Sequence, residues 1–339
     1  GDGFTITPYL EERDHFLTHD RPASTGMGVK NLLVKDTIVE VDVLLKTDTP
    51  KQQVALDVPK ALAGYSQGLT SGDWVFTAGE HATDFIGDIG RNDYNGPRSA
   101  IQIDARTPSE LLWYGLPVKL QTQKLFEKLE RNLETCGSSM KDVVHATIYY
   151  SHPKNLAEIE EAWFEWFPED PPARTLIPYM GIGIRGCDPE IALIALKKDG
   201  QTKKQSIRAD GVGAPVGHEP HAVKAGDLLF FSTQIAGDRN GLCAGGRRAD
   251  EYPWYGLPAR TQMNFILDNV AKICEAAGTS IENICRRQAF HTDFDWFMES
   301  VDEWFRHFPK DPPCSTTLEI GGPLHVDGAL FLLDLIGYC

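Results

Sequence analysis

The sequence has no apolar run long enough to cross a membrane as a helix, although 42% of its 339 residues are hydrophobic. The longest runs resemble ALFLLDLIGY (Ala329–Tyr338), which is well short of the ~20 residues that a bilayer requires. The first residues, GDGFTITPYLEERDHF, contain neither the basic nor the apolar region of a signal peptide. We therefore expect a globular protein that has no contact with a membrane.

Basic residues are scarce. The chain has 33 Lys and Arg against 48 Asp and Glu, which gives a formal net charge of −15. An extended nucleic-acid interface needs clustered Lys and Arg to neutralise phosphates, so this composition argues against one. The partner that we expect is a small molecule.

Paired metal ligands are also missing. No two cysteines form a CxxC pair, and their scattered positions are typical of free thiols in a reducing cytoplasm. The closest histidines, His218 and His221, form either a coordinating pair or part of a solvated loop. We expect no metal and no cofactor. The seven cysteines are Cys136, Cys187, Cys243, Cys274, Cys285, Cys314 and Cys339.

What the sequence does contain is a segment that recurs about two and a third times. FPEDPPART begins at Phe167, FPKDPPCST begins at Phe308, and a shorter DRPAST begins at Asp20. The pentapeptide WYGLP occurs at Trp113–Pro117 and again at Trp254–Pro258, at the same distance from the DPP motif in both copies. Such gap-free spacing indicates duplication.

The copies divide the chain into a partial unit (residues 1–48) and two complete units. We call residues 64–200 unit one and residues 207–339 unit two. Each complete unit predicts strands and helices in the order β, β, α, β, α, β, β, an α+β mixed sheet with two helices on one face. The partial unit matches only the closing strands. Truncation, processing and a natively partial third copy are all consistent with it.

TAGE after a strand, CGSSMKDVVHATIYY after a long helix, then EEAWFEWFP, PPART and EIALIAL resemble the RidA family, also called YjgF or UK114. The resemblance implies a chorismate-mutase-like fold, a trimer-like ring of units and ligand clefts between neighbours. It also implies a homo-oligomer or an intrachain pseudo-trimer. Known members hydrolyse enamines and imines, such as 2-aminoacrylate, without a cofactor, and 2-aminomuconate deaminases are relatives.

The resemblance assigns roles to four residues of unit one. Arg174 falls on the arginine that grips the substrate carboxylate, and Glu190 falls on the acid associated with the hydrolytic water. Tyr65 and Gly79 fall on the pocket wall. Three positions depart from the family pattern and put its standard small substrate in doubt: Ala78, Ala157 and Leu176.

In unit two the arginine position is Ser315, and the glutamate position is Phe331 or Leu332. That cleft should lack both groups, whereas Ser232 keeps the serine that unit one lacks. A composite site with Arg174 from unit one and Ser232 from unit two is therefore conceivable. The repetition of Tyr114 as Tyr255, with the tryptophans Trp113 and Trp254 beside them, favours a packing role for all four, and pocket lining stays open for Tyr114.

The residue types suit hydrolysis. A guanidinium holds a carboxylate through two parallel hydrogen bonds, and a carboxylate can position water and accept its proton. We predict a cofactor-independent enamine or imine deaminase of the cytoplasm, with Arg174 binding the substrate carboxylate and Glu190 activating water. Other hypotheses are a chorismatase-like or ring-opening hydrolase and a non-catalytic module that binds carboxylate metabolites. A purely structural Arg174, paired with Asp170 or Glu190, also stays open.

Overall fold

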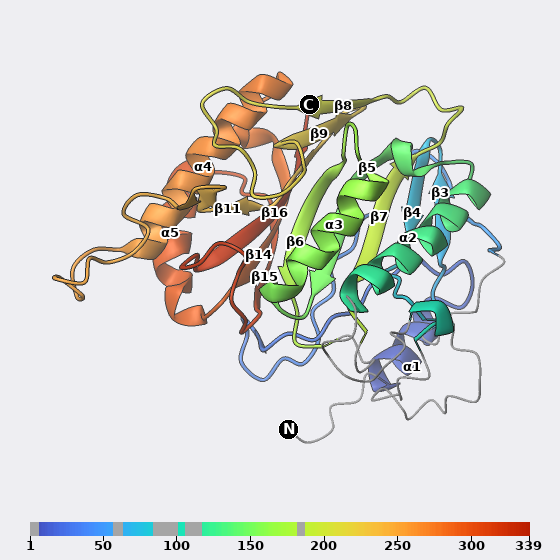
Figure 1. Cartoon of the computed structure of the whole chain (residues 1–339), viewed down its shortest axis with the longest axis horizontal. Helices are drawn as coiled ribbons and strands as arrows, with labels where there is room; N and C mark the ends of the chain where they lie inside the picture. Colours follow the sequence, from blue (N-terminus) through green and yellow to red (C-terminus); the bar gives the residue numbers. More distant parts are fainter. Residues whose placement is uncertain (1–6, 57–63, 84–100, 106–116, 182–186) are drawn as a thin grey trace.

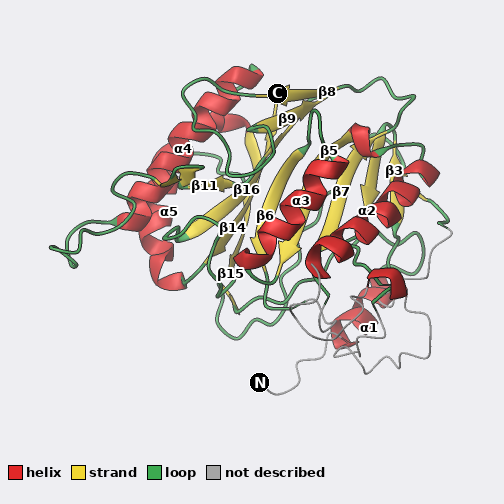
Figure 2. Ribbon diagram, in the orientation of Figure 1, coloured by secondary structure: helices red, strands yellow, loops and turns green. Residues whose placement is uncertain are grey.

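The computed structural model describes the chain except for residues 1–6, 57–63, 84–100, 106–116 and 182–186. The fold is mixed α+β. Two sheets face each other, and each carries a pair of helices on its outer side (Figures 1 and 2). None of the helices in the described ranges is long and apolar enough to cross a membrane.

Unit one contributes a six-stranded sheet with the order β2-β3-β4-β7-β5-β6. Helices α2 (Pro117–Thr135) and α3 (Leu156–Trp166) cover its outer face and bury a core that includes Leu125, Leu129 and Trp163. The strands are β2 (Gln52–Gln53), β3 (Gly68–Ser71), β4 (Trp74–Thr77), β5 (Val143–Tyr150), β6 (Ala173–Pro178) and β7 (Glu190–Leu196).

Unit two contributes most of an eight-stranded sheet with the order β1-β15-β14-β16-β10-β9-β8, in which β11 also pairs with β16. Its outer helices are α4 (Pro258–Ala277) and α5 (Phe297–His307). The strands are β1 (Asn31–Leu32), β8 (Lys204–Ile207), β9 (Ala222–Ala225), β10 (Leu228–Phe231), β11 (Gln234–Ile235), β14 (Ile284–His291), β15 (Cys314–Glu319) and β16 (Phe331–Tyr338).

Short elements complete the chain. Helix α1 (Thr7–Phe16) precedes both units, and β12 (Gly237–Asp238) pairs with β13 (Gly241–Leu242). The 3-10 helices are η2 (Ile103–Ala105), η3 (Met140–Asp142), η4 (Pro153–Asn155), η5 (Ile281–Asn283) and η6 (Phe294–Trp296).

The two sheets share one topology. The order β3-β4-β7-β5-β6 in unit one corresponds to β9-β10-β16-β14-β15 in unit two, and both contain one parallel pair, β5 with β6 and β14 with β15. The two parallel pairs have the same register. Ala146 lies opposite Arg174 in unit one, and the equivalent residues Arg287 and Ser315 lie opposite each other in unit two. Equivalent positions on these elements therefore differ by a constant offset, which the site comparison below uses.

The inner faces of the two sheets pack against each other and fix the relative position of the units. The Phe230 ring of β10 lies 5.8 Å from the Trp74 ring and 5.7 Å from the His145 ring. The Thr175 hydroxyl of β6 donates a 2.6 Å hydrogen bond to Asp334 of β16, which is buried. This contact places the open edge of β6 beside unit two.

Residues 37–47 correct the expectation that the partial unit forms closing strands, because the structure gives them no strand. Only β1 pairs with a sheet, through Asn31 opposite Glu319 of β15. Asp42 is held by Arg286 of β14 at 3.1 Å, whereas Val41 and Val43 are exposed. Thr316 of β15 also lies 3.4 Å from Asp42, so this segment meets unit two through side chains and not through a backbone ladder.

Candidate functional site

Arg174 lies on β6 and points to the helix face of the sheet. Alternation along a strand puts it on the same side as Leu176, which belongs to the core under α2 and α3. Its side chain is fully buried, and its guanidinium carbon lies 4.6 Å from the centre of the Trp163 ring on α3. The arginine is therefore part of the packing between α3 and the edge of the sheet.

Two carboxylates of the same chain bind this guanidinium. Arg174 Nε donates to Glu219 of unit two, and Nη2 donates to Glu160 of α3. Although burial favours its neutral form, the two negative charges raise the pKa of Arg174 above its usual value. The group that was expected to bind a substrate carboxylate is instead neutralised by acids of the same chain.

The loop of unit two that follows β10 covers the edge of β6 beside Arg174. The Arg174 backbone amide donates to Ser232 Oγ at 3.3 Å, and the amide of Thr233 donates to the Arg174 carbonyl at 2.9 Å. The predicted juxtaposition of Arg174 and Ser232 is therefore present, made through the backbone of Arg174. Aligning the turn glycines Gly72 and Gly226 shows that Glu219 takes the position of Tyr65 in unit one.

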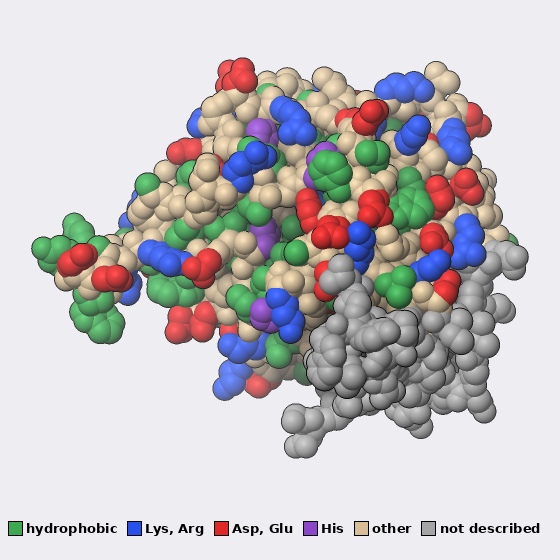
Figure 3. All heavy atoms as spheres, in the orientation of Figure 1, with side chains coloured by type: hydrophobic (Ala, Val, Ile, Leu, Met, Phe, Trp, Pro, Cys, Tyr) green, Lys and Arg blue, Asp and Glu red, His purple; other side chains and the backbone are tan. Residues whose placement is uncertain are grey.

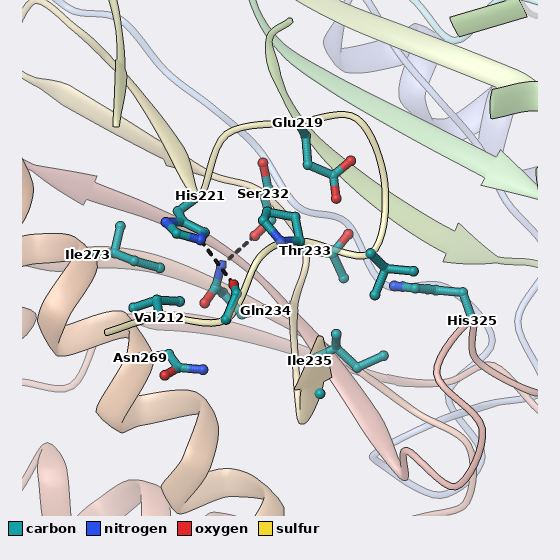
Figure 4. Close-up of a pocket in the computed structure, with 14 residues that line it drawn as sticks. Val212, Glu219, His221, Ser232, Thr233, Gln234, Ile235, Asn269, Ile273 and His325 are labelled. Carbon is teal, nitrogen blue, oxygen red and sulfur yellow. Dashed lines mark hydrogen bonds between the residues drawn. The ribbon is translucent and has the colours of Figure 1, made fainter. Parts of the chain in front are cut away.

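A cavity of about 40 Å³ lies next to Glu219 and Ser232 (Figure 4). It has room for a few water molecules at most. His325 lies at its border, with a ring Nδ1 that has no hydrogen-bond partner in the described structure, and burial lowers the pKa of His325 to about 4. The cleft beside Arg174 is thus nearly filled by the protein itself.

Glu190 begins β7 and points to the opposite face of the sheet. Arg174 pairs with Ala146 of β5, whereas Glu190 pairs with Tyr149, three residues further along the same strand. An odd number of steps along a strand reverses the face, and the two Cα atoms are roughly 14 Å apart by strand geometry. The structure does not bring Arg174 and Glu190 together, which corrects the expectation of one cleft that contains both.

Glu190 lies in a buried cluster of acid–base groups. Its side chain is buried beside Tyr65, Gly79 and His81, and its Oε2 has no hydrogen-bond partner in the described structure. Burial, and then the negative charge of Glu80, raise the pKa of Glu190 well above its usual value. Burial lowers the pKa of His81 to about 3, so this ring is neutral at physiological pH. The surroundings of Glu190 therefore favour the protonated form of its carboxyl group.

Glu80 and Lys128 form a buried ion pair beside this cluster. Lys128 Nζ lies 2.6 Å from Glu80 Oε2, and both side chains are only 4% exposed. Gln67 donates a 3.2 Å hydrogen bond to the other Glu80 oxygen. Sequence reasoning missed this pair, although Lys128 stands between Leu125 and Leu129 on the apolar face of α2, and a lysine there needs a buried partner.

Gly79 makes room for the Glu190 carboxyl. A Cβ atom at this position would overlap Glu190 Oε1 and would lie 2.8 Å from the Thr25 side chain. We expect Gly79→Ala to destabilise the fold by about 1–3 kcal/mol through overpacking. Chemical denaturation checks this, with Gly322→Ala, whose Cβ would meet nothing closer than 3.7 Å, as the control. Equal effects of the two substitutions would contradict the argument.

Near Glu190, the residue that takes the position equivalent to Arg174 is Ser24. The amide of Gly79 donates to the Ser24 carbonyl, as the amide of Thr233 donates to the Arg174 carbonyl in the other cleft. In unit two the residue equivalent to Glu190 is Leu332, because Phe290 of β14 pairs with it as Tyr149 pairs with Glu190. The site around Arg174 therefore has the arginine without the glutamate, and the site around Glu190 has the glutamate without the arginine.

The repeated WYGLP motif gives a further correction. Tyr114, predicted to line the pocket or to pack, lies outside the described residues. In the second copy, Trp254 is 91% exposed and Tyr255 is 81% exposed, so these rings are not core. The segment between β13 and α4, which contains both residues, projects at the left of Figures 1 and 3. Arg248 holds the base of this loop by donating to the Gly256 carbonyl.

No group of His, Cys, Asp and Glu suited to a metal ion occurs in the described part of the chain. His221 Nδ1 accepts from the Ala209 amide, and His218 Nε2 lies 2.8 Å from the Phe167 carbonyl. The described geometry therefore places the closest histidine pair in loop contacts, and the expectation of a protein without cofactor stays a prediction.

Comparison with known proteins finds similarity over part of the chain. Residues 105–197 match the family described as Endoribonuclease L-PSP. A RutC family protein of Pyrococcus abyssi is 28% identical over 120 residues, which are 35% of this chain and 76% of that protein. A RutC family protein of Pyrococcus horikoshii is 27% identical over 122 residues, or 36% of this chain and 78% of that protein.

Solved structures are similar to a comparable share of the chain. RidA from the Antarctic bacterium Psychrobacter sp. PAMC 21119 is 23% identical, covers 43% of this chain and 98% of its own, and has a TM-score of 0.33. Yeast Mmf1 is 19% identical, covers 40% of this chain and 98% of its own, and has a TM-score of 0.33.

Proposed function

Since the match at residues 105–197 makes this chain a member of the RidA family, we propose that it is a cofactor-independent hydrolase of enamines or imines. Glu190 is its proton-transfer group. The observation that carries the proposal is the buried carboxyl of Glu190 with its raised pKa, which lies between the His81 ring and the Glu80–Lys128 pair. Its Oε2 has no hydrogen-bond partner in the described structure.

A raised pKa suits Glu190 to enamine hydrolysis. The neutral acid protonates the β-carbon of the enamine, and the C=C electron pair forms the new C–H bond while nitrogen becomes an iminium. The Glu190 carboxylate then takes a proton from water as its oxygen attacks the iminium carbon. Collapse of the adduct expels ammonia, so that enamine and water give a carbonyl compound and ammonia. General acid–base catalysis of this kind contributes about 10²–10⁴-fold.

The substrate that fits this cleft best is a neutral one. Arg174, predicted to hold a substrate carboxylate, lies on the other face and is neutralised by Glu219 and Glu160. Ser24 takes its place beside Gly79, and Glu80 adds negative charge close to Glu190. An anionic acid would meet repulsion here, whereas an uncharged enamine or imine would not.

The test is ammonia release by the wild type and by Glu190→Gln. The substrates are a neutral imine, produced in situ by an amine oxidase, and 2-aminoacrylate, produced by a lyase. We expect release above the spontaneous rate with the neutral imine, a loss of about 10²–10⁴-fold in Glu190→Gln, and wild-type release by the matched control Glu134→Gln on the exposed side of α2.

The pH profile adds a second readout. Because the reaction needs protonated Glu190, the rate should be constant at low pH and fall as the pH rises through the raised pKa of Glu190. Turnover of 2-aminoacrylate alone would overturn the neutral substrate. Release that is equal in wild type and Glu190→Gln would overturn the role of Glu190, and no release from either substrate would overturn the hydrolase.

An endoribonuclease-like role is the other activity that the family description suggests. The net charge of −15 and the acidic groups around Glu190 disfavour it, since a phosphodiester backbone would be repelled. Arg174 is the one predicted site residue whose geometry favours a non-catalytic role, because its guanidinium is already paired. Closure of the ring by a third unit and a cytoplasmic location are proposed on the resemblance and on the cysteine pattern.

A further inference from the structure

Unit two contains a buried arginine that the site described above does not use. Arg287 lies on β14 and is only 2% exposed. Its guanidinium carbon lies 4.5 Å from the centre of the Trp304 ring on α5, which stacks on Phe308 with 4.3 Å between ring centres. The arrangement puts a cation on an aromatic platform inside the helix layer.

Unit one has the same platform, with the arginine on the neighbouring strand. Arg174 lies 4.6 Å from the Trp163 ring, whose centre is 4.3 Å from that of Phe167. Arg174 belongs to β6, opposite Ala146 of β5. In unit two Arg287 takes the β5-like position, opposite Ser315, which takes the place of Arg174. In unit one the arginine is on the edge strand and the small residue on its neighbour, and in unit two the two positions are reversed. Unit two therefore has a buried guanidinium that the sequence comparison did not predict.

The two guanidinium groups differ in their partners. Arg287 Nη1 donates to Ser315 Oγ at 2.8 Å, but Nε and Nη2 have no hydrogen-bond partner in the described structure. In unit one, the same two atoms of Arg174 bind carboxylate oxygens of Glu219 and Glu160. This edge of an arginine side chain presents two parallel N–H groups, the geometry that matches a carboxylate.

The acids of unit one have no counterpart at Arg287. The offset that places Trp163 on Trp304 places Glu160 on Val301, so α5 offers no carboxylate here. The described residues that follow β15 give Arg287 no partner like Glu219 either. Burial lowers the pKa of Arg287 only to about 10, so the group stays charged at neutral pH. A buried cation without a partner is costly and rare in proteins.

A second unpartnered group lies nearby on the same face of β14. Neither ring nitrogen of the buried His291 has a hydrogen-bond partner in the described structure, and burial and the Arg287 charge lower the pKa of His291 to about 3. Ser315, the acceptor of Arg287 Nη1, is exposed, so the platform is next to the surface.

We propose that the Nε–Nη2 edge of Arg287, on the Trp304 ring, is a binding site for a small monocarboxylate anion. The ligand completes in unit two the ion pair that Glu219 and Glu160 complete in unit one. The site is separate from the Glu190 pocket and does not depend on the proposed hydrolysis.

The test uses the full chain and acetate as the probe. Thermal unfolding is followed while sodium acetate replaces sodium chloride at constant ionic strength, and binding is measured separately from the line width of ¹³C-labelled acetate. We expect acetate to raise the Tm of the wild type and of Arg247→Met, an exposed arginine that serves as control. Arg287→Met should not respond, and Arg287→Lys should bind about tenfold more weakly, because lysine lacks the parallel N–H groups.

Arg287→Met removes an unpaired buried charge and should fold, and Arg287→Lys retains the charge as a second variant. Light scattering separates a free carboxylate from an acidic side chain of a second copy. The proposal expects the same mass for wild type and Arg287→Met. An equal acetate response in wild type and Arg287→Met, the lack of any response in the wild type, or self-association that Arg287→Met abolishes would each overturn it.

Discussion

Replacing Glu219 by alanine is expected to lower the free energy of unfolding by about 3–5 kcal/mol, since it breaks a buried ion pair from one side. Arg174 would keep only Glu160, which is partly exposed, while its guanidinium stays buried on Trp163. Urea denaturation of the full chain measures the loss. Glu169→Ala, at an exposed position after α3, is the control and should change stability by less than about 0.5 kcal/mol.

The double variant Arg174→Met/Glu219→Met makes the interpretation specific. Removing both charges leaves no fully buried ion without a partner, since Glu160 is partly exposed to water, so this variant should recover most of the stability that Glu219→Ala loses. If the double variant is as unstable as the single one, the contact matters through shape and packing, and the electrostatic argument is wrong. The outcome also bears on function, because a strong Arg174–Glu219 pair leaves little room for a substrate carboxylate at Arg174.

Much of the fold can be predicted from the sequence where local patterns decide it. The long helix expected before CGSSMKDVVHATIYY is α2 (Pro117–Thr135), and the β-branched run DVVHATIYY forms β5 (Val143–Tyr150). Repeated turn and proline motifs place both complete copies in register, since WYGLP and DPP keep their spacing. The mixed α+β class follows from these elements and is confirmed.

The site was harder to predict because its geometry depends on which strands are neighbours. Arg174 and Glu190 share one unit and a plausible spacing, but the register through β5 puts them on opposite faces. Glu219 and Arg287 were missed since each takes its role from residues far away in sequence. The prediction that Trp254 packs in the core was wrong, because a residue that recurs in two copies of a repeat need not be buried.

Lys128→Met is expected to lower the free energy of unfolding by about 3–5 kcal/mol at pH 8. The substitution leaves the Glu80 carboxylate buried without its cation and close to the Glu190 carboxyl, whose pKa is raised by burial and by the Glu80 charge. Urea denaturation of the full chain at pH 8 measures the loss.

The double variant Lys128→Met/Glu80→Gln removes both charges and should regain most of the loss at pH 8. It also separates the contribution of the ion pair to stability from the effect of Glu80 on the pKa of Glu190. Glu80 adds to the raised pKa of Glu190, and without its charge that pKa should fall towards the value set by burial alone. The decline of the hydrolysis rate with rising pH should then begin at lower pH. A stable double variant with an unchanged rate profile would contradict the coupling of Glu80 to Glu190 and would leave the ion pair with a purely structural role.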